Sequence, residues 1–178
     1  MRRLTVLAGA FGAALLLSSG AFAQVPADPN NPNETVPDKY NYTPYGETIK
    51  LADAKKVAEA AVSEATKRGW PMCISVVGPT GDLVYFEKMD DCQYASVEIS
   101  QNKARAAARY RRPTVVFERL IAKGQYFAYL PTLGAGFTGS RGGNPIVAGG
   151  KIVGAIGVSG GTGAQDDTVS QAGAAALK

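Results

Sequence analysis

The sequence contains no histidine, although it is 178 residues long. Without imidazole, neither a Ser-His-Asp nor a Cys-His catalytic unit can form. The same absence excludes a histidine-liganded zinc site and a heme bound through a proximal histidine. Tryptophan occurs once and cysteine twice. After residue 23, no apolar run reaches the roughly 20 residues that a membrane-spanning helix needs. Any chemistry assigned to this chain must work without imidazole.

The first 23 residues have the layout of a secretory signal peptide. Arg2 and Arg3 give a positive start, residues 4–17 are apolar, and residues 21–23 form a small-x-small cleavage site. A retained membrane anchor is the alternative, but the apolar run is short for a span and leads into a cleavage site. We therefore expect export by the general secretory route, with Gln24 as the first mature residue. The protein would then be periplasmic or secreted.

Cys73 and Cys92 are the two cysteines of the chain. In a protein exported to an oxidising compartment, an even count favours a disulfide. Two buried thiols are the alternative, because cysteine is often simply a small core residue. One cysteine lies in a predicted strand and the other in a predicted loop, so geometry could forbid the bridge. The sequence leaves both interpretations open.

Charge is nearly balanced in the mature part of the chain. Removal of the signal peptide takes away two arginines, so that 17 basic residues face 15 acidic residues and the net charge is +2. Charges of both signs are mixed along the sequence, which gives no electrostatic footprint for nucleic acid. We therefore expect neither a nucleic-acid partner nor a membrane span after cleavage.

Composition divides the mature chain into two parts. Residues 24–47 alternate proline with asparagine and have few apolar side chains, so this segment cannot repay its ordering entropy by burial. We predict a linker there. Its tyrosines Tyr40, Tyr42 and Tyr45 either attach its end to the domain or belong to a solvated tether. Residues 48–178 are long enough for one domain.

Hydrophobic periodicity predicts the elements of that domain. Three- and four-residue spacing predicts helices, and β-branched or alternating runs bounded by glycine predict strands. The expected helices cover 48–68, 96–110, 114–123 and 164–177, and the expected strands cover 72–77, 83–88, 144–148 and 151–159, with a further short candidate at 137–138. Hairpin-length turns join the paired strands. This order predicts an α/β protein of the α+β type, a mainly antiparallel sheet packed with helices.

Several stretches of the domain resemble one known family. Ser96–Ala104 followed by Ala107–Thr114 resembles the signature S-x-E-I-x-x-x-K-A…A-x-x-F-R-R-P-T of the GlcG/HbpS family, which has a DUF336-type domain. Gly143–Ile146 is similar to the G-G-x-P-I of that family, and Lys151–Asp166 resembles its most recognisable stretch almost residue for residue. The resemblance covers roughly residues 51–177.

This resemblance implies a profilin- or roadblock-like domain that assembles into oligomers and binds heme. The family also includes a protein encoded with glycolate-oxidation functions and a domain attached to corrinoid adenosyltransferases, so a corrinoid is the alternative cofactor. No shared enzymatic reaction unites its members. We therefore expect a binding protein and not an enzyme.

The loop 160–163 could hold a heme propionate. It opens a helix, so the backbone N–H groups of Gly161 and Thr162 and the helix dipole favour an anion there. The alternative is structural, because glycines also let a strand-to-helix corner pass close to a sheet. Asp166 and Asp167, in the first turn of the helix, would repel an anion.

Three cations in the first motif could also pair with propionates. These are Lys103, Arg111 and Arg112, and the planar fork of arginine suits carboxylates. Alternatively, one of these residues pairs with Glu98 or Glu118 within the helical layer and the other is solvated.

The iron ligand must be a residue other than histidine. Tyrosinate binds ferric heme iron in some proteins, and Tyr110 lies inside the best-matched motif, where the family often has phenylalanine. Plain packing of that ring is the alternative. The hydroxyl of Thr114 belongs to the same motif. The remaining candidates are Tyr94, Met72, Met89 and Cys92.

One hypothesis and two rivals follow from these observations. We expect an exported, oligomeric heme-binding protein that carries, buffers or senses heme in a cavity built by residues 96–114 and 143–166. The first rival is a non-catalytic accessory protein that contacts a periplasmic dehydrogenase or a sensor. The second is a binder of a corrinoid or another small molecule.

Overall fold

Helices and strands follow one another in the α-β-β-α-α-β-β-α order that periodicity predicts. The structure, a computed structural model, describes residues 42–124 and 136–177, and the predicted signal peptide and residues 24–41 lie outside them. The helices are α1 (Leu51–Arg68), α2 (Ser96–Arg109), α3 (Val115–Ala122) and α4 (Gly163–Ala174). The strands are β1 (Cys73–Val77), β2 (Leu83–Lys88), β3 (Gly143–Ala148) and β4 (Lys151–Ser159).

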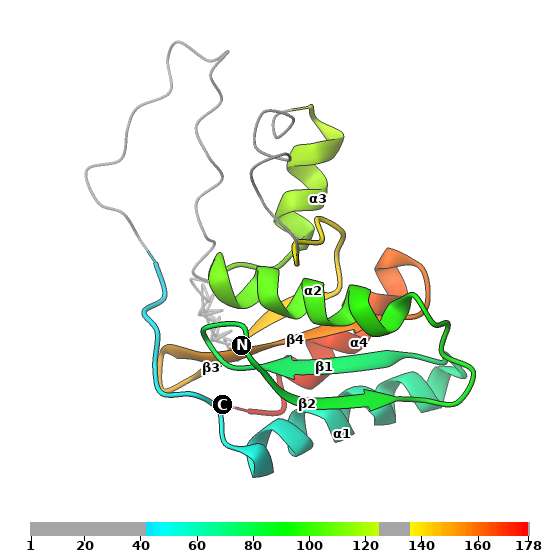
Figure 1. The fold of residues 1–178 in the computed structure, drawn as a ribbon, viewed down its shortest axis with the longest axis horizontal. Coiled ribbons are helices and arrows are strands. Elements are labelled where there is room, and N and C mark those ends of the chain that lie inside the picture. Colours follow the sequence, from blue (N-terminus) through cyan, green and yellow to red (C-terminus); the bar gives the residue numbers. More distant parts are fainter. Residues whose placement is uncertain (1–41, 125–135, 178) are drawn as a thin grey trace, which may run out of the picture.

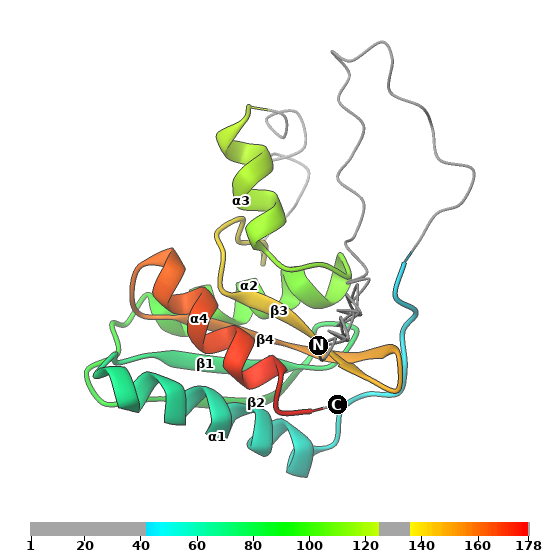
Figure 2. The ribbon, with the colours of Figure 1, turned by 180° about the vertical axis from the view of Figure 1, so that it is seen from behind.

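The strands form one antiparallel sheet in the order β2-β1-β4-β3. Helices α1 and α4 cover one face of the sheet, and α2 covers the other (Figures 1 and 2). Helix α3 follows α2 and stands away from the sheet (Figure 1). The predicted α+β fold is therefore confirmed.

The larger core lies between the sheet and the pair α1 and α4. All five residues of β1 are buried, as expected for a central strand covered on both faces. Helix α1 turns Val57 and four alanines toward this core, and α4 contributes Val169; the alanines are Ala54, Ala58, Ala61 and Ala65. Side chains from both helices and from β1, β3 and β4 thus share one apolar layer.

Helix α2 approaches the other face closely because small residues meet there. Ala104 and Ala107 of the helix pack against Ala155 of β4. A Cβ atom on Gly157 would come within 2.0 Å of the Ser100 carbonyl oxygen, so only glycine allows this approach. Close packing of α2 fixes where its C-terminal end emerges over the sheet.

A disulfide joins Cys73, the first residue of β1, to Cys92 in the loop before α2. The two Cα atoms lie 6.0 Å apart, within the usual range for a bridged pair. Of the two interpretations that the sequence left open, the structure therefore has the disulfide. The bridge ties the entry of α2 to the sheet.

The strand candidate at 137–138 is wrong. These residues form an irregular segment before β3. The Phe137 ring packs edge-on against Phe117 of α3, with ring centres 5.0 Å apart. Because its apolar side chain is engaged by a helix, this short run joins no sheet.

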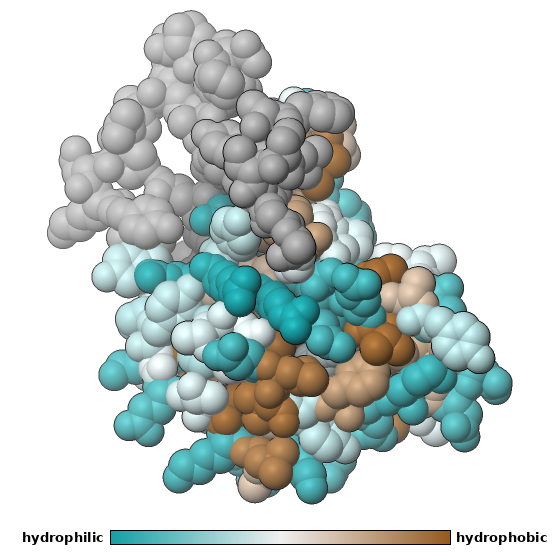
Figure 3. Space-filling model, in the orientation of Figure 1, coloured by the Kyte–Doolittle hydropathy of each residue, from teal (hydrophilic) through white to brown (hydrophobic). Residues whose placement is uncertain are grey.

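The face of the molecule seen in Figure 3 carries more than one hydrophobic patch. Hydrophobic side chains gather over the starts of α1 and β2, the elements that carry the exposed Leu51 and Leu83 (Figure 3). No helix among residues 42–124 and 136–177 is long and apolar enough to cross a bilayer.

The chain enters the domain as a strap, defined here as residues 42–49, beside the start of β4. Its backbone makes three hydrogen bonds of 2.8 Å with Ile152 and Val153. Strand β1 pairs with β4 only from Ala155 onward, so the strap extends the pairing of β4 where β1 has ended. This contact favours attachment of Tyr42 and Tyr45 to the domain; Tyr40 lies outside the described residues.

Candidate functional site

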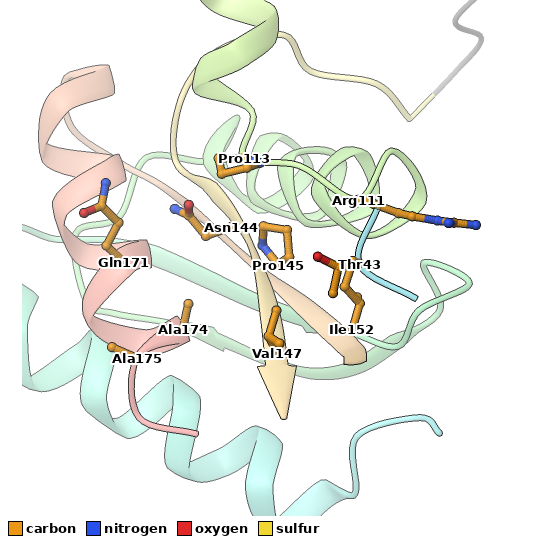
Figure 4. A pocket seen from close by; sticks show the side chains of 10 residues that line it. All are labelled: Thr43, Arg111, Pro113, Asn144, Pro145, Val147, Ile152, Gln171, Ala174 and Ala175. Atoms are coloured by element: carbon orange, nitrogen blue, oxygen red, sulfur yellow. The ribbon is translucent and has the colours of Figure 1, made fainter. Parts of the chain in front are cut away.

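A groove of about 390 Å³ opens along β3 (Figure 4). Helix α4 borders it on one side, and the α2–α3 connection and the strap border it on the other. Its volume falls in the range of roughly 300–1,000 Å³ that is usual for small-molecule sites. The lining residues are Thr43, Arg111, Pro113, Asn144, Pro145, Val147, Ile152, Gln171, Ala174 and Ala175.

The sheet edge beside this groove is poorly suited to an added strand. The N–H of Gly143 is already bonded to the Thr114 hydroxyl, and the Gly143 carbonyl accepts the Thr114 N–H at 2.9 Å. Two residues further on, Pro145 has no N–H to donate. The groove therefore fits a small molecule better than a peptide that would pair with β3.

Thr114, a candidate iron ligand, is fully buried. Its hydroxyl oxygen accepts the N–H of Gly143 at 2.9 Å and donates to the Gly143 carbonyl at 3.4 Å. The hydroxyl thus joins the start of α3 to β3. Because Thr114 is fully buried, its hydroxyl could reach a ligand only if this joint between α3 and β3 opened.

Arg111 stands where the chain leaves α2, at the strap end of the groove. Its φ of 55° turns the backbone sharply. The central guanidinium carbon lies 4.7 Å from the ring centre of Tyr42 and 4.2 Å from that of Tyr45. Figure 4 shows the Arg111 side chain extending away from the other lining side chains. Arg111 is therefore a residue of the rim.

Tyr110 and Arg112 face α3. The Tyr110 ring meets Phe117 and Phe137 edge-on, with ring centres 5.2 and 5.8 Å apart. Arg112 donates from Nε to the Tyr110 carbonyl at 3.0 Å, and its guanidinium carbon lies 5.9 Å from the Phe117 ring centre. Neither residue lines the groove. Of these three consecutive motif residues, only Arg111 thus lines the groove.

Lys103 lies in the interior and is not a surface cation. Its side chain is only 2% exposed, and Nζ donates to Asp166 Oδ2 at 2.7 Å and to the Val158 carbonyl at 3.1 Å. Burial raises the pKa of the Asp166 carboxyl, and the Lys103 ammonium opposes that shift. The pair joins α2 to the start of α4. The structure does not bring Lys103 to the two arginines.

The backbone N–H groups of the loop before α4 donate to nearby side chains at the start of α4. The N–H of Gly161 donates to Asp166 Oδ1 at 3.0 Å, and the N–H of Thr162 donates to Gln165 Oε1 at 2.8 Å. The Thr162 hydroxyl in turn accepts the Gln165 N–H, which completes a capping box. The geometry therefore supports the structural interpretation of this loop, because the N–H groups expected to bind an anion already have acceptors.

Glu118 pairs with Arg141 and not with one of the three predicted cations. Glu118 Oε1 accepts from Arg141 Nε at 2.7 Å, and Oε2 accepts from the Arg141 backbone N–H at 2.8 Å. These hydrogen bonds lower the pKa of the Glu118 carboxyl below its usual range. The pair holds α3 to the segment that leads into β3.

The remaining iron candidates lie away from the groove. Cys92 is in the disulfide, and Met72 is fully buried in the core. Met89 packs against that core. Tyr94 is 91% exposed near the start of α2, at the other end of a helix roughly 20 Å long. Among the described residues, no group of three or more His, Cys, Asp or Glu side chains could hold a metal ion.

Comparison with known proteins decides the family. The family model described as "Haem degrading protein HbpS-like" matches residues 49–175. The chain belongs to the HbpS-like family. Protein GlcG of Escherichia coli strain K12 is 42% identical over 107 residues, which make up 60% of this chain and 77% of GlcG. The resemblance predicted from the motifs is thus confirmed.

Solved structures of HbpS-like proteins share the fold. The crystal structure of HbpS superposes with a TM-score of 0.67 at 31% identity, covering 75% of this chain and 92% of HbpS. The crystal structure of a PduOC:heme complex gives a TM-score of 0.68 at 25% identity, covering 74% of this chain and 96% of that one. A heme complex is therefore known for one similar structure.

In this HbpS-like chain, the two motifs do share a groove, but only part of each motif reaches it. Two lining residues, Arg111 and Pro113, come from residues 96–114, and four come from residues 143–166, namely Asn144, Pro145, Val147 and Ile152. Sequence reasoning missed Thr43 of the strap and the end of α4. Thr43 has no distinguishing pattern, and only the fold brings α4 next to β3.

The groove of this HbpS-like chain fits one part of heme better than another. Prolines and aliphatic side chains suit the apolar macrocycle, and the rim arginine suits a propionate. None of the ten lining residues is a histidine, cysteine, methionine or tyrosine, the side chains that usually bind heme iron. The lining thus fits the macrocycle and carboxylates but provides no strong axial ligand.

Proposed function

We propose that this chain is an exported heme-binding protein that carries, buffers or senses heme as an oligomer. The observation that supports this most strongly is the groove along β3, apolar over most of its lining, with Arg111 at its rim. Family membership and the heme complex of a similar structure support the same ligand.

Heme would lie with its macrocycle against β3 and α4 and its propionates toward the strap. Pro145, Val147 and Ala174 would remove apolar surface of the macrocycle from water, which is the main driving force for binding a flat apolar group. Charged carboxylates are costly to bury unpaired, so they would remain at the rim near Arg111. When bound, heme would supply the redox and oxygen chemistry, and the chain would supply orientation.

A hemin titration tests this proposal. We expect the chain without its signal peptide to give a Soret band with micromolar hemin. Val147→Glu should weaken binding by about tenfold or more, because it places a carboxylate on the apolar wall. Val147 is 39% exposed on the edge strand β3, so the variant should fold.

Leu83→Glu is the matched control for that variant. Leu83 is 46% exposed on β2, the opposite edge of the sheet, and it does not line the groove. Its hemin affinity should equal that of the parent chain. A flat spectrum of the parent chain, or equal weakening by both variants, would contradict the groove proposal. Preferential binding of cobalamin would instead support the corrinoid alternative.

Tyr110 remains the candidate iron ligand from the sequence, and its position makes it testable. Its ring lies outside the groove lining and against α3, so a Tyr110 ligand would require heme on that side of the chain. If heme lies in the groove, Tyr110→Phe should leave the Soret maximum unchanged. A shift of the maximum in this variant would move the proposed heme site from the groove to the α3 side.

Heme degradation is a second candidate, because the description of the family names that activity. The absence of histidine argues against a conventional heme-degrading site in this chain. We expect the Soret band of the hemin-loaded chain to persist under air and ascorbate as long as that of hemin bound to albumin. Faster loss in the chain, abolished by Val147→Glu, would establish degradation instead.

Export is the last part of the proposal. If residues 1–23 are removed during secretion, the protein recovered from a bacterial periplasm should begin at Gln24. Mass spectrometry of the intact protein would show this directly. Recovery of an uncleaved chain in the membrane fraction would support the anchor alternative.

A further inference from the structure

The strap contacts the end of α2 through its side chains, which a solvated tether would not do. Tyr45 is fixed at two points: its backbone bridges to Ile152 of β4, and its hydroxyl lies 3.0 Å from the Ala108 carbonyl and 2.8 Å from the Arg109 carbonyl. Both carbonyls belong to the last turn of α2, where no further helical N–H groups follow to donate to them; that of Ala108 also accepts the Arg111 N–H at 3.2 Å. The Tyr45 ring is therefore held rigidly beside a residue of the α2–α3 connection.

That neighbouring residue is Arg111, and the two strap tyrosines engage only part of its guanidinium. Cation–π contacts with Tyr42 and Tyr45 use the faces of the rings, at 4.7 and 4.2 Å. The N–H donors of a guanidinium point outward in its own plane. No acceptor for those donors is found among the described residues. Arg111 is thus held in place with its donors available.

Arg111 places these N–H donors at one end of the groove. Thr43, between the two tyrosines in sequence, lines the groove together with Arg111 and Ile152. In Figure 4 Thr43 and Ile152 lie between Pro145 and the outward-pointing Arg111. A ligand with its apolar part along β3 would leave the groove over Thr43. A carboxylate at that end of the ligand would meet the Arg111 guanidinium.

We propose that Tyr42 and Tyr45 are positioning residues that hold Arg111 as the carboxylate-recognising group of this site. The ligand class is an amphipathic molecule with a flat apolar body and carboxylates at one end. This inference rests on the proposed function, because heme is such a molecule. The strap tyrosines lie before residue 49, where the family match begins, so the arrangement is argued from this chain alone.

Hemin and hemin dimethyl ester test the inference, because the two propionates are free carboxylates in hemin and uncharged methyl esters in the other ligand. We expect the chain without its signal peptide to prefer hemin over the ester by about tenfold, since a charge-assisted pair is lost in the ester. Arg111→Gln and the double variant Tyr42→Leu/Tyr45→Leu should both reduce this ratio toward one. Their affinity for the ester should change little.

Tyr42→Phe/Tyr45→Phe is the matched control. It keeps both rings over Arg111 and removes only the hydroxyls, so the preference for hemin should persist. A merely structural role for the tyrosines would weaken both ligands equally in the leucine variant and leave their ratio unchanged. Thermal melting of each variant without ligand checks that the domain is folded.

The possible outcomes separate the inference from the function on which it rests. If the parent chain binds neither ligand, the proposed function fails and the inference with it. If the parent binds both ligands equally, heme binding stands and recognition of carboxylates by Arg111 is wrong. If Arg111→Gln loses the preference but the leucine variant keeps it, Arg111 acts without the strap and the inference is overturned.

Discussion

Lys103 and Arg111 belong to the same sequence motif, yet they occupy opposite environments. Lys103 is 2% exposed and is bonded to the Asp166 carboxylate and a backbone carbonyl. Arg111 lies at the rim of a groove, where only aromatic rings contact its guanidinium among the described residues. Sequence alone grouped both as ligands for propionates, whereas the fold assigns the first to the interior.

The difference teaches how to interpret cations in such a motif. A buried ammonium needs a partner, and Lys103 directs two of its three N–H donors to acceptors in the interior, where no ligand reaches it. A guanidinium held by its faces keeps its donors. The interior cation should therefore govern stability, and the rim cation should govern ligand preference.

The largest expected effect is loss of the interior pair. Lys103→Met should lower the free energy of unfolding by about 3–5 kcal/mol at neutral pH, because it leaves the buried Asp166 carboxylate without its counterion. Urea denaturation followed by circular dichroism measures the change. Arg111→Gln, the rim counterpart, should cost less than about 1 kcal/mol. Similar losses in both variants would remove the distinction between the two cations.

The disulfide should come next in size. It closes a loop with a sequence separation of 19, so Cys73→Ala/Cys92→Ala should lower the free energy of unfolding by about 3 kcal/mol. Because the bridge holds the start of α2, far from the rim, hemin affinity at a temperature where the variant is folded should not change. A weaker hemin complex would show that the two ends of α2 are coupled.

The fold could be predicted from the sequence more completely than the site. Alternating and helical periodicity was enough for the elements and the antiparallel sheet, because each depends on local burial along the chain. The direction of Lys103 could not be predicted, since its partner Asp166 lies 63 residues away. Asp166 also takes the Gly161 N–H, so one distant contact changed the interpretation of two predicted site residues. Thr43 became part of the groove only because β1 ends before β4 does.

Two acidic residues, one in the interior and one at the surface, should give the stability opposite dependences on pH. Burial raises the pKa of Asp166, whereas Arg141 lowers the pKa of Glu118 at the surface. The Asp166 contribution to stability is complete below its unfolded pKa and is lost as the pH rises through the folded pKa. The Glu118 contribution is present above its unfolded pKa and is lost as the pH falls through the folded pKa.

Asp166→Asn and Glu118→Gln measure these opposite slopes. Between about pH 3 and 7, the free energy of unfolding of the parent chain minus that of the variant should fall with pH for Asp166 and rise for Glu118. Urea titrations at several pH values give both differences. If the Asp166 difference also rises with pH, attraction by Lys103 outweighs burial and the interior pair behaves like the surface pair.

The smallest effect should come from one hydroxyl at the rim. Tyr45→Phe removes the donor that lies 3.0 and 2.8 Å from two carbonyls at the end of α2, and keeps the ring over Arg111. Tyr45 is 37% exposed, so water can replace the lost donor and the free energy of unfolding should fall by only about 1 kcal/mol. Hydrogen exchange of the last amides of α2 should accelerate, while the preference for hemin over its dimethyl ester stays. Loss of that preference in this variant would show that Arg111 is positioned through the helix end and not through the aromatic ring.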